Sequence, residues 1–225
     1  MGGPSEFASF FSDDRRRSIL RSLIDGYYAD LPVDHVVFDT NRTWTARMAL
    51  IRDVYPSARV ICCVRNVAQV LDSFERMIRR NPLQIPRGLN FNAGQTVYAR
   101  VENLMHSETG LVGVAWSALR EAWFGDQAKH LILVDYDELV ARPEKVLRGL
   151  YRELGQPWYP HDFQSVAHDE SEYDARLGMP GLHEVRSRVE RRDLEPCIPP
   201  DIYSKYMEAS FWARRELNTR GAVIL

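Results

Sequence analysis

Three short runs of apolar residues most constrain the fold of this chain. They span residues 35–40, 59–64 and 130–135, and each is nearly continuous rather than alternating. A strand that is covered on both faces needs such a run, whereas a strand with one solvated face alternates apolar and polar residues. The three runs therefore predict parallel strands in the interior of the protein.

Helical patterns lie between and around these runs. Asp13 and Asp14 can cap the first helix, and Pro143 and Gly155 mark an orderly start and stop for another. The expected helices span residues 13–28, 43–55, 67–80, 111–124, 143–154 and 200–217. Strands that alternate with helices predict an α/β fold, with a parallel sheet flanked by helices and joined by right-handed crossovers.

The length of 225 residues suits one domain with a buried core. We expect a single domain over residues 1–225, with a core at about 35–158 and a helical C-terminal region, in part a lid, at about 159–225. The formal net charge of -2 gives no reason to expect nucleic acid as a partner. The sequence leaves open whether the protein forms a homodimer.

The cysteines and the hydropathy indicate the cellular setting. Cys62, Cys63 and Cys197 show neither metal-ligand spacing nor a disulfide framework, which is typical of a reducing cytoplasm. No apolar run approaches the ~20 residues of a membrane span, and no signal-peptide core follows Met1. We therefore expect a cytoplasmic protein without a metal site or a membrane span.

The most informative segment couples a strand to a helix through Arg65. This residue follows the run at 59–64, and Ser73 comes eight residues later in the expected helix. Ligands of open α/β sheets bind outside the carboxyl ends of the strands, where a guanidinium can grip a phosphate with two hydrogen bonds. The helix start adds backbone N–H groups. From the residues alone, an alternative is equally acceptable. In that alternative Arg65 pairs with a nearby carboxylate, and Ser73 is an ordinary residue on the helix surface.

The wider sequence resembles the sulfotransferase superfamily. Val64-Arg65-Asn66 followed by Ser73 is similar to the 3′-phosphate-binding motif of that family. Residues 131–144 are similar to its strand–Tyr-Glu–Leu–Pro segment, and residues 150–158 to the helix end that closes with Gly-Pro-Trp. Residues 36–42 stand where the family has a strand that delivers a catalytic or substrate-contacting group. Order and spacing agree from about Val36 to Trp158, roughly half of the chain.

The resemblance implies a P-loop-NTPase-like fold and 3′-phosphoadenosine 5′-phosphosulfate as sulfuryl donor, with adenosine 3′,5′-bisphosphate as product. Arg65 and Ser73 would hold the 3′-phosphate. Tyr136 would contact adenine, its alternative role being to pack against the helix that follows. Arg186 or Arg188 could approach the nucleotide from a C-terminal basic segment, although a surface ion pair is favoured for Arg188.

The implied reaction needs a base and cationic groups. Asp39 is the first candidate base, because it ends the strand expected nearest the phosphate site. Arg42 is a candidate electrostatic helper, although the family lysine expected near Thr40 or Asn41 is absent. His183 could return to the site from the C-terminal region. The acceptor would be a hydroxyl or amine of a small molecule, lipid or carbohydrate, with specificity in the loop Asn81–Gln95 and in the C-terminal region.

The N-terminal loop that cradles the 5′-phosphosulfate in this family has no counterpart before His35. Truncation, a strand supplied by a partner chain, or a degenerate homologue would each explain this, and truncation is favoured because the other motifs are in order. The alternative function is a non-catalytic nucleotide-binding module that keeps only the 3′-phosphate site. A small-molecule kinase is disfavoured because no G-x-x-x-x-G-K-[ST] loop occurs.

Overall fold

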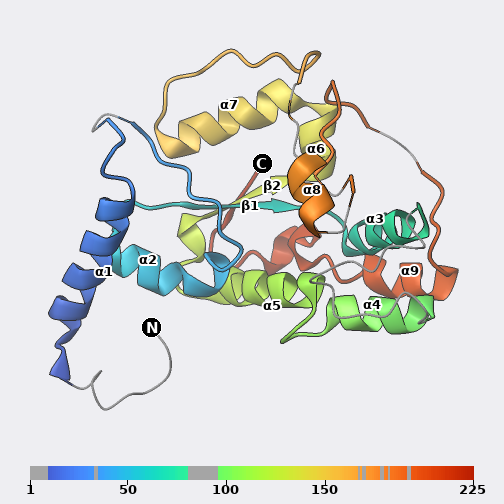
Figure 1. The fold of residues 1–225 in the computed structure, drawn as a ribbon, viewed down its shortest axis with the longest axis horizontal. Coiled ribbons are helices and arrows are strands. Elements are labelled where there is room, and N and C mark those ends of the chain that lie inside the picture. Colours follow the sequence, from blue (N-terminus) through green and yellow to red (C-terminus); the bar gives the residue numbers. More distant parts are fainter. Residues whose placement is uncertain are drawn as a thin grey trace. The chain divides into compact units, whose positions relative to one another are not determined.

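The computed structural model divides the chain into two compact units, Met1–Ala58 and Arg59–Leu225. Each unit is described by itself, and its elements can be followed in Figure 1. The expected single domain stays a prediction. The structure describes residues 10–32, 35–80, 96–166, 168, 171–177, 180–181, 183–191 and 194–225. The segment before Phe10 and the expected acceptor loop at 81–95 lie outside these residues.

The first unit contains two helices that polar contacts hold together. They are α1 (Asp13–Tyr27) and α2 (Met48–Val54), the latter preceded by a 3₁₀ turn, Thr45–Arg47. The Oγ of Ser12, rather than Asp13 or Asp14, caps α1 by accepting the N–H of Arg15 at 3.3 Å. Arg17 of α1 donates to both carboxylate oxygens of Asp53 on α2, at 2.9 and 3.1 Å.

The prediction of a strand at residues 35–40 is wrong. This segment forms no strand, and Val36, Val37 and Phe38 are 51, 42 and 64% exposed. An apolar run specifies what a strand could bury, but a strand also needs a partner for its backbone groups. No ladder partner is found for 35–40 among the described residues.

The second unit contains a parallel sheet with the strand order β1-β2-β3. The two longer strands, β1 (Val60–Val64) and β2 (Leu131–Asp135), confirm the predicted strands at 59–64 and 130–135. They pair in register from Val60 opposite Leu131 to Val64 opposite Asp135. The central strand β2 is buried on both faces, as its unbroken apolar run predicted. The short strand β3 (Val223–Ile224) pairs with β2 and was not predicted.

Helices surround this sheet and confirm the α/β fold. Figure 1 shows α7 (Pro143–Leu154) on one side of the sheet and α5 (Leu111–Phe124) on the other. The predicted bounds of α3 (Val67–Arg80), α5 and α7 are confirmed. The helices α4, α6 and α8 were not predicted. The last helix, α9, ends at Met207, and two 3₁₀ turns follow it in place of the remaining helical residues that were expected. The helices are α3 (Val67–Arg80), α4 (Val97–Met105), α5 (Leu111–Phe124), α6 (Tyr136–Ala141), α7 (Pro143–Leu154), α8 (Ser171–Leu177) and α9 (Pro200–Met207).

Aromatic side chains tie the C-terminal part of this unit to α5. Trp123 of α5 is fully buried, and its indole N–H donates to the carbonyl oxygen of Leu217 at 3.2 Å. The ring of Phe211 packs edge-on against Trp123 and Trp116, with centroids 5.8 and 5.9 Å apart. Burial of such rings is a large hydrophobic contribution, so this cluster anchors the segment that leads into β3. None of the helices in the described part of the chain has the length and apolar character of a membrane span.

Candidate functional site

Two predicted site residues meet where β1 and β2 end. Arg65 directly follows β1 and Tyr136 directly follows β2, and the last residues of the two strands, Val64 and Asp135, are register partners. The guanidinium carbon of Arg65 lies 4.3 Å from the centroid of the Tyr136 ring, within the range of a cation–π contact. The parallel sheet thus brings these residues together at its carboxyl edge.

The start of α6 fixes the position of Tyr136. The carboxylate of Asp135 caps this helix by accepting the N–H groups of Asp137 and Glu138 at 2.9 and 3.1 Å. The N–H of Asp135 itself donates to the carbonyl oxygen of Leu225 at 2.9 Å. Tyr136 is therefore held between a capped helix and a paired strand, which limits the positions open to its ring.

The guanidinium of Arg65 is only partly used by the protein. Its Nε donates to Oε1 of Gln69 at 3.0 Å. Among the described residues, no carboxylate forms an ion pair with Arg65, and its two terminal nitrogens have no recorded hydrogen bond. The carboxylate-paired alternative therefore finds no partner in this part of the chain. A partly buried guanidinium whose two terminal nitrogens are not used by the described residues is suited to bidentate contact with a phosphate.

Arg65, Gln69 and Ser73 follow one another at intervals of four residues. Residues four apart lie on one face of a helix, so the exposed Ser73 of α3 is one turn beyond the amide that orients Arg65. No hydrogen bond joins the side chains of Arg65 and Ser73. Gln69 was missed as a site residue, although its spacing from both predicted residues could have identified it.

The first N–H groups of α3 are already occupied. The N–H of Val67 donates to Oγ of Ser210 at 3.2 Å, and that of Ala68 to Oδ1 of Asn66 at 3.0 Å. The amide of Asn66 also donates to the carbonyl oxygen of Met207 at 3.3 Å. Two backbone donors that were expected to meet an anion instead donate to capping side-chain oxygens, and the bonds to Ser210 and Met207 attach the end of α9 and the segment after it to α3. The expectation that these backbone N–H groups bind an anion is therefore wrong, and side chains are left as the main anion ligands.

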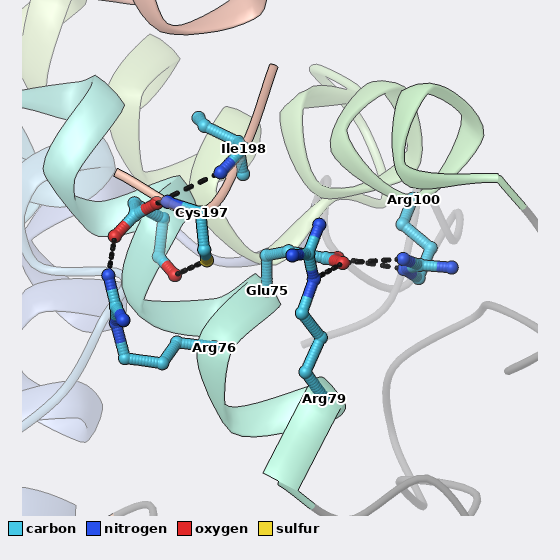
Figure 2. Close-up of polar contacts among 7 residues, drawn as sticks. Glu75, Arg76, Arg79, Arg100, Cys197 and Ile198 are labelled. Carbon is cyan, nitrogen blue, oxygen red and sulfur yellow. Dashed lines mark hydrogen bonds and ion pairs between the residues drawn. The ribbon is translucent and has the colours of Figure 1, made fainter. Parts of the chain in front are cut away.

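A buried carboxylate anchors α3 to α4. Glu75 is 1% exposed and accepts hydrogen bonds from Arg79 at 2.8 Å and from Arg100 at 2.6 and 2.9 Å. Figure 2 shows both guanidinium groups converging on this carboxylate. The ion pair with Arg100 is largely removed from water, so it fixes the mutual position of the two helices.

A second carboxylate, Asp72, joins α3 to the segment before α9. It accepts the N–H groups of Cys197 and Ile198 at 2.5 and 3.1 Å and a hydrogen bond from Arg76 at 2.8 Å. Figure 2 shows Cys197 and Ile198 directed at this part of α3. Burial disfavours the charged carboxylate, but the hydrogen bonds from Cys197 and Arg76 outweigh it and lower the pKa of Asp72. The helix that carries Ser73 is therefore held on both sides.

Asp39 and Arg42 belong to the first unit. Asp39 accepts hydrogen bonds from the hydroxyl of Tyr28 and from Nε1 of Trp44, the latter at 2.6 Å. The hydrogen bond to Asp39 raises the pKa of Tyr28 to about 12. The strand that was expected to end at Asp39 is absent, and Arg42 is exposed in a turn. Their catalytic roles stay predictions.

His183 forms a close pair with a buried carboxylate that sequence reasoning missed. Asp174 of α8 is 2% exposed and accepts both the backbone N–H of His183 at 2.8 Å and its Nδ1 at 2.5 Å. Burial opposes ionisation of Asp174, but hydrogen bonds from His183 lower its pKa below the ordinary value. Because the carboxylate accepts from Nδ1, the ring presents Nε2 for proton transfer.

The remaining predicted contact, Arg186, is exposed in an irregular segment, and its proposed approach to a nucleotide stays a prediction. Within the described ranges, no group of three or more His, Cys, Asp or Glu residues could hold a metal ion. The site is therefore described by its cationic and aromatic side chains.

The sheet and its cationic edge define an α/β protein with a candidate anion site beyond the carboxyl ends of parallel strands. A profile of the sulfotransferase family matches residues 6–160, which is more than half of the chain. The chain belongs to the sulfotransferase family. The match begins well upstream of Val36, where the resemblance of individual motifs began. A comparison with curated proteins gave no match.

Proposed function

We propose that this protein transfers a sulfuryl group from 3′-phosphoadenosine 5′-phosphosulfate to a hydroxyl or amine of a small-molecule, lipid or carbohydrate acceptor. The observation that carries the proposal is the guanidinium of Arg65, which lies over Tyr136 at the carboxyl edge of the sheet without a carboxylate partner among the described residues. A cation held in this way is available to a phosphate. Membership of the sulfotransferase family supports the same donor.

In this proposal the nucleotide is recognised mainly by side chains. The terminal nitrogens of Arg65 bind the 3′-phosphate, with the hydroxyl of Ser73 as a second donor. The hydrogen bond from Nε of Arg65 to Gln69 fixes the guanidinium to α3, the helix that carries Ser73. Tyr136 offers adenine a ring edge and a hydroxyl, and Arg186 adds positive charge from the C-terminal region. The 3′-phosphate is the group that separates this nucleotide from ATP.

Proton removal is proposed for His183. The acceptor oxygen or nitrogen forms a bond to sulfur while the bond from sulfur to the 5′-phosphate oxygen breaks, and that oxygen keeps the electron pair. The acceptor proton moves to Nε2 of His183, whose Nδ1 is held by Asp174. Asp39 is the alternative base, with both oxygens already accepting hydrogen bonds, and Arg42 is the proposed electrostatic helper.

Calorimetric titration with adenosine 3′,5′-bisphosphate and with adenosine 5′-monophosphate tests the nucleotide site. Arg65→Ala should weaken binding of the bisphosphate by about 1.5–3 kcal/mol, the usual contribution of a charged hydrogen bond, and should change binding of the monophosphate little. Arg59→Ala is the matched control, since Arg59 precedes the same strand and donates to the carbonyl oxygen of Lys129 at 2.9 Å. Equal affinity of wild type and Arg65→Ala for the bisphosphate would exclude this site.

Transfer is tested with donor labelled with sulfur-35 in the sulfuryl group. Wild-type protein should move the label to acceptors from a panel of phenols, sterols and sugars. Tight bisphosphate binding without transfer to any acceptor would instead support a non-catalytic nucleotide-binding module.

A further inference from the structure

A cavity in the second unit lies between α7 and the end of β3, and the proposed sulfuryl transfer makes no use of it. Its volume is about 750 Å³. Figure 1 shows α7 beside the red C-terminal end of the chain. The cavity is lined by Glu138, Arg142, Glu144, Lys145, Val146, Arg148, Gly149, Arg152, Arg215, Ile224 and Leu225.

The floor of the cavity is apolar and closely packed. Val146 is 4% exposed, and Ile224 and Leu225 contribute further apolar surface. A Cβ on Gly149 would lie only 3.0 Å from Cδ2 of Leu225, so a glycine allows α7 to approach this end of the sheet. A bound molecule would therefore meet an apolar floor beneath a charged rim.

Basic side chains dominate the rim, and its two side-chain carboxylates are already paired. Glu138 pairs with Arg142, and Glu144 accepts from Arg148 at 2.7 and 2.8 Å. Arg148 is further fixed by the ring of Trp158, whose centroid lies 4.2 Å from the guanidinium carbon. In each pair the arginine lies four residues after the glutamate, on the same helical face. The two acidic side chains of the rim are therefore neutralised.

Three cations of the rim remain. Among the described residues, the side chains of Lys145, Arg152 and Arg215 have no recorded ion pair or hydrogen bond. Lys145 and Arg152 are seven residues apart on α7, which places them on one face and roughly 10 Å apart along the axis. Arg215 comes from a 3₁₀ turn far along the chain. Like charges gathered at one cavity repel one another, and an anion would relieve this repulsion.

We propose that this cavity binds an organic polyanion whose sulfate or phosphate esters are spaced roughly 10 Å apart, matching two turns of α7. The ester groups contact Lys145, Arg152 and Arg215, and the carbon skeleton lies over Val146 and Leu225. Arg65 does not line this cavity, so the proposal stands whether or not the chain transfers sulfuryl groups.

Calorimetry at low ionic strength tests the proposal with sucrose octasulfate and inositol hexakisphosphate, which separate sulfate from phosphate esters. Uncharged sucrose is the control ligand. We expect at least one polyanion to bind and sucrose not to bind. Replacing Lys145, Arg152 and Arg215 together by Gln should weaken polyanion binding by about tenfold or more, since each exposed charge contributes a factor of about two to five.

The matched control replaces Arg120, Lys205 and Arg214 by Gln, which removes the same charge from exposed positions outside the lining. This variant and Arg65→Ala should bind the polyanion like the wild type, and circular dichroism should show that all variants are folded. Equal losses in the two triple variants would overturn the proposal, because attraction would then depend on net charge alone. Loss of binding in Arg65→Ala, or no binding of either polyanion to the wild type, would overturn it as well.

Discussion

The guanidinium of Arg65 lies over the ring of Tyr136, 4.3 Å from its centroid. The two residues are far apart in the sequence and meet because each directly follows a strand, and the final residues of those strands pair in register. The contact holds the cation in place before any ligand binds, so the Arg65 side chain loses less conformational entropy when a phosphate binds. The parallel sheet is thus the element that assembles the candidate site.

Gln69 orients Arg65, so replacements there should change nucleotide affinity without removing the cation. Gln69→Ala should weaken binding of adenosine 3′,5′-bisphosphate by about 0.5–1.5 kcal/mol, because Nε of Arg65 loses its acceptor. Gln69→Glu should weaken it further, since it supplies Arg65 with a carboxylate partner and repels the phosphate. Calorimetry measures both, and a Gln69→Glu variant that binds more tightly than Gln69→Ala would contradict this role.

The buried carboxylate of Glu75 should be important for stability. Glu75→Gln removes the negative charge that pairs with Arg100, in a site where the Arg100 side chain is 11% exposed. Breaking a buried pair in this way costs about 3 kcal/mol or more, measurable as the free energy of unfolding in urea. Glu172→Gln breaks an exposed pair with Arg176 on α8 and should cost less than about 1 kcal/mol. Similar losses in the two variants would show that Glu75 is not the anchor of α3.

The lowered pKa of Asp72 predicts a pH-dependent contribution to folding. The folded protein binds a proton at Asp72 less readily than the unfolded chain, whose ordinary pKa is about 3.9. The stability gained is therefore complete above that pH and is lost as the pH falls through the lower folded-state pKa. Asp72→Asn should destabilise the protein at neutral pH, and its difference from wild type should shrink in urea titrations below about pH 4. A difference that is constant with pH would exclude ionisation of Asp72 as its cause.

The pair of Asp174 and His183 predicts a loss of turnover without a loss of nucleotide binding. His183→Ala should reduce sulfuryl transfer by roughly a hundredfold or more, and Asp174→Asn should reduce it because the amide favours the wrong ring tautomer. Asp162→Asn is a matched control, because Asp162 accepts two backbone N–H groups without contacting a histidine in any recorded hydrogen bond. Full activity of His183→Ala would assign proton removal to another residue, with Asp39 as the next candidate.

Sequence reasoning was reliable where local pattern and burial agreed. The helices at 67–80, 111–124 and 143–154 have long apolar stripes or clear end signals, and the structure confirms their bounds. The run at 130–135 became a central strand because its apolar residues are covered on both faces. The similar run at 35–40 gave no strand, because apolar character alone does not supply a hydrogen-bonding partner.

The site itself was only partly accessible from the sequence. Arg65 was found because it directly follows a recognisable strand, and Tyr136 was found through the resemblance of residues 131–144 to the sulfotransferase pattern. The capping of α3 by Ser210 was not, since it joins segments far apart in the chain and depends on tertiary packing. Asp174 was missed because nothing in the sequence indicates that its carboxylate would accept from His183, nine residues further along the chain.

A crystal structure with adenosine 3′,5′-bisphosphate tests the central claim most directly. The account predicts the 3′-phosphate at the carboxyl edge of the sheet, within hydrogen-bond distance of the terminal nitrogens of Arg65 and of the Ser73 hydroxyl. The bisphosphate bound elsewhere, with Arg65 still directed only at Gln69 and Tyr136, would contradict it.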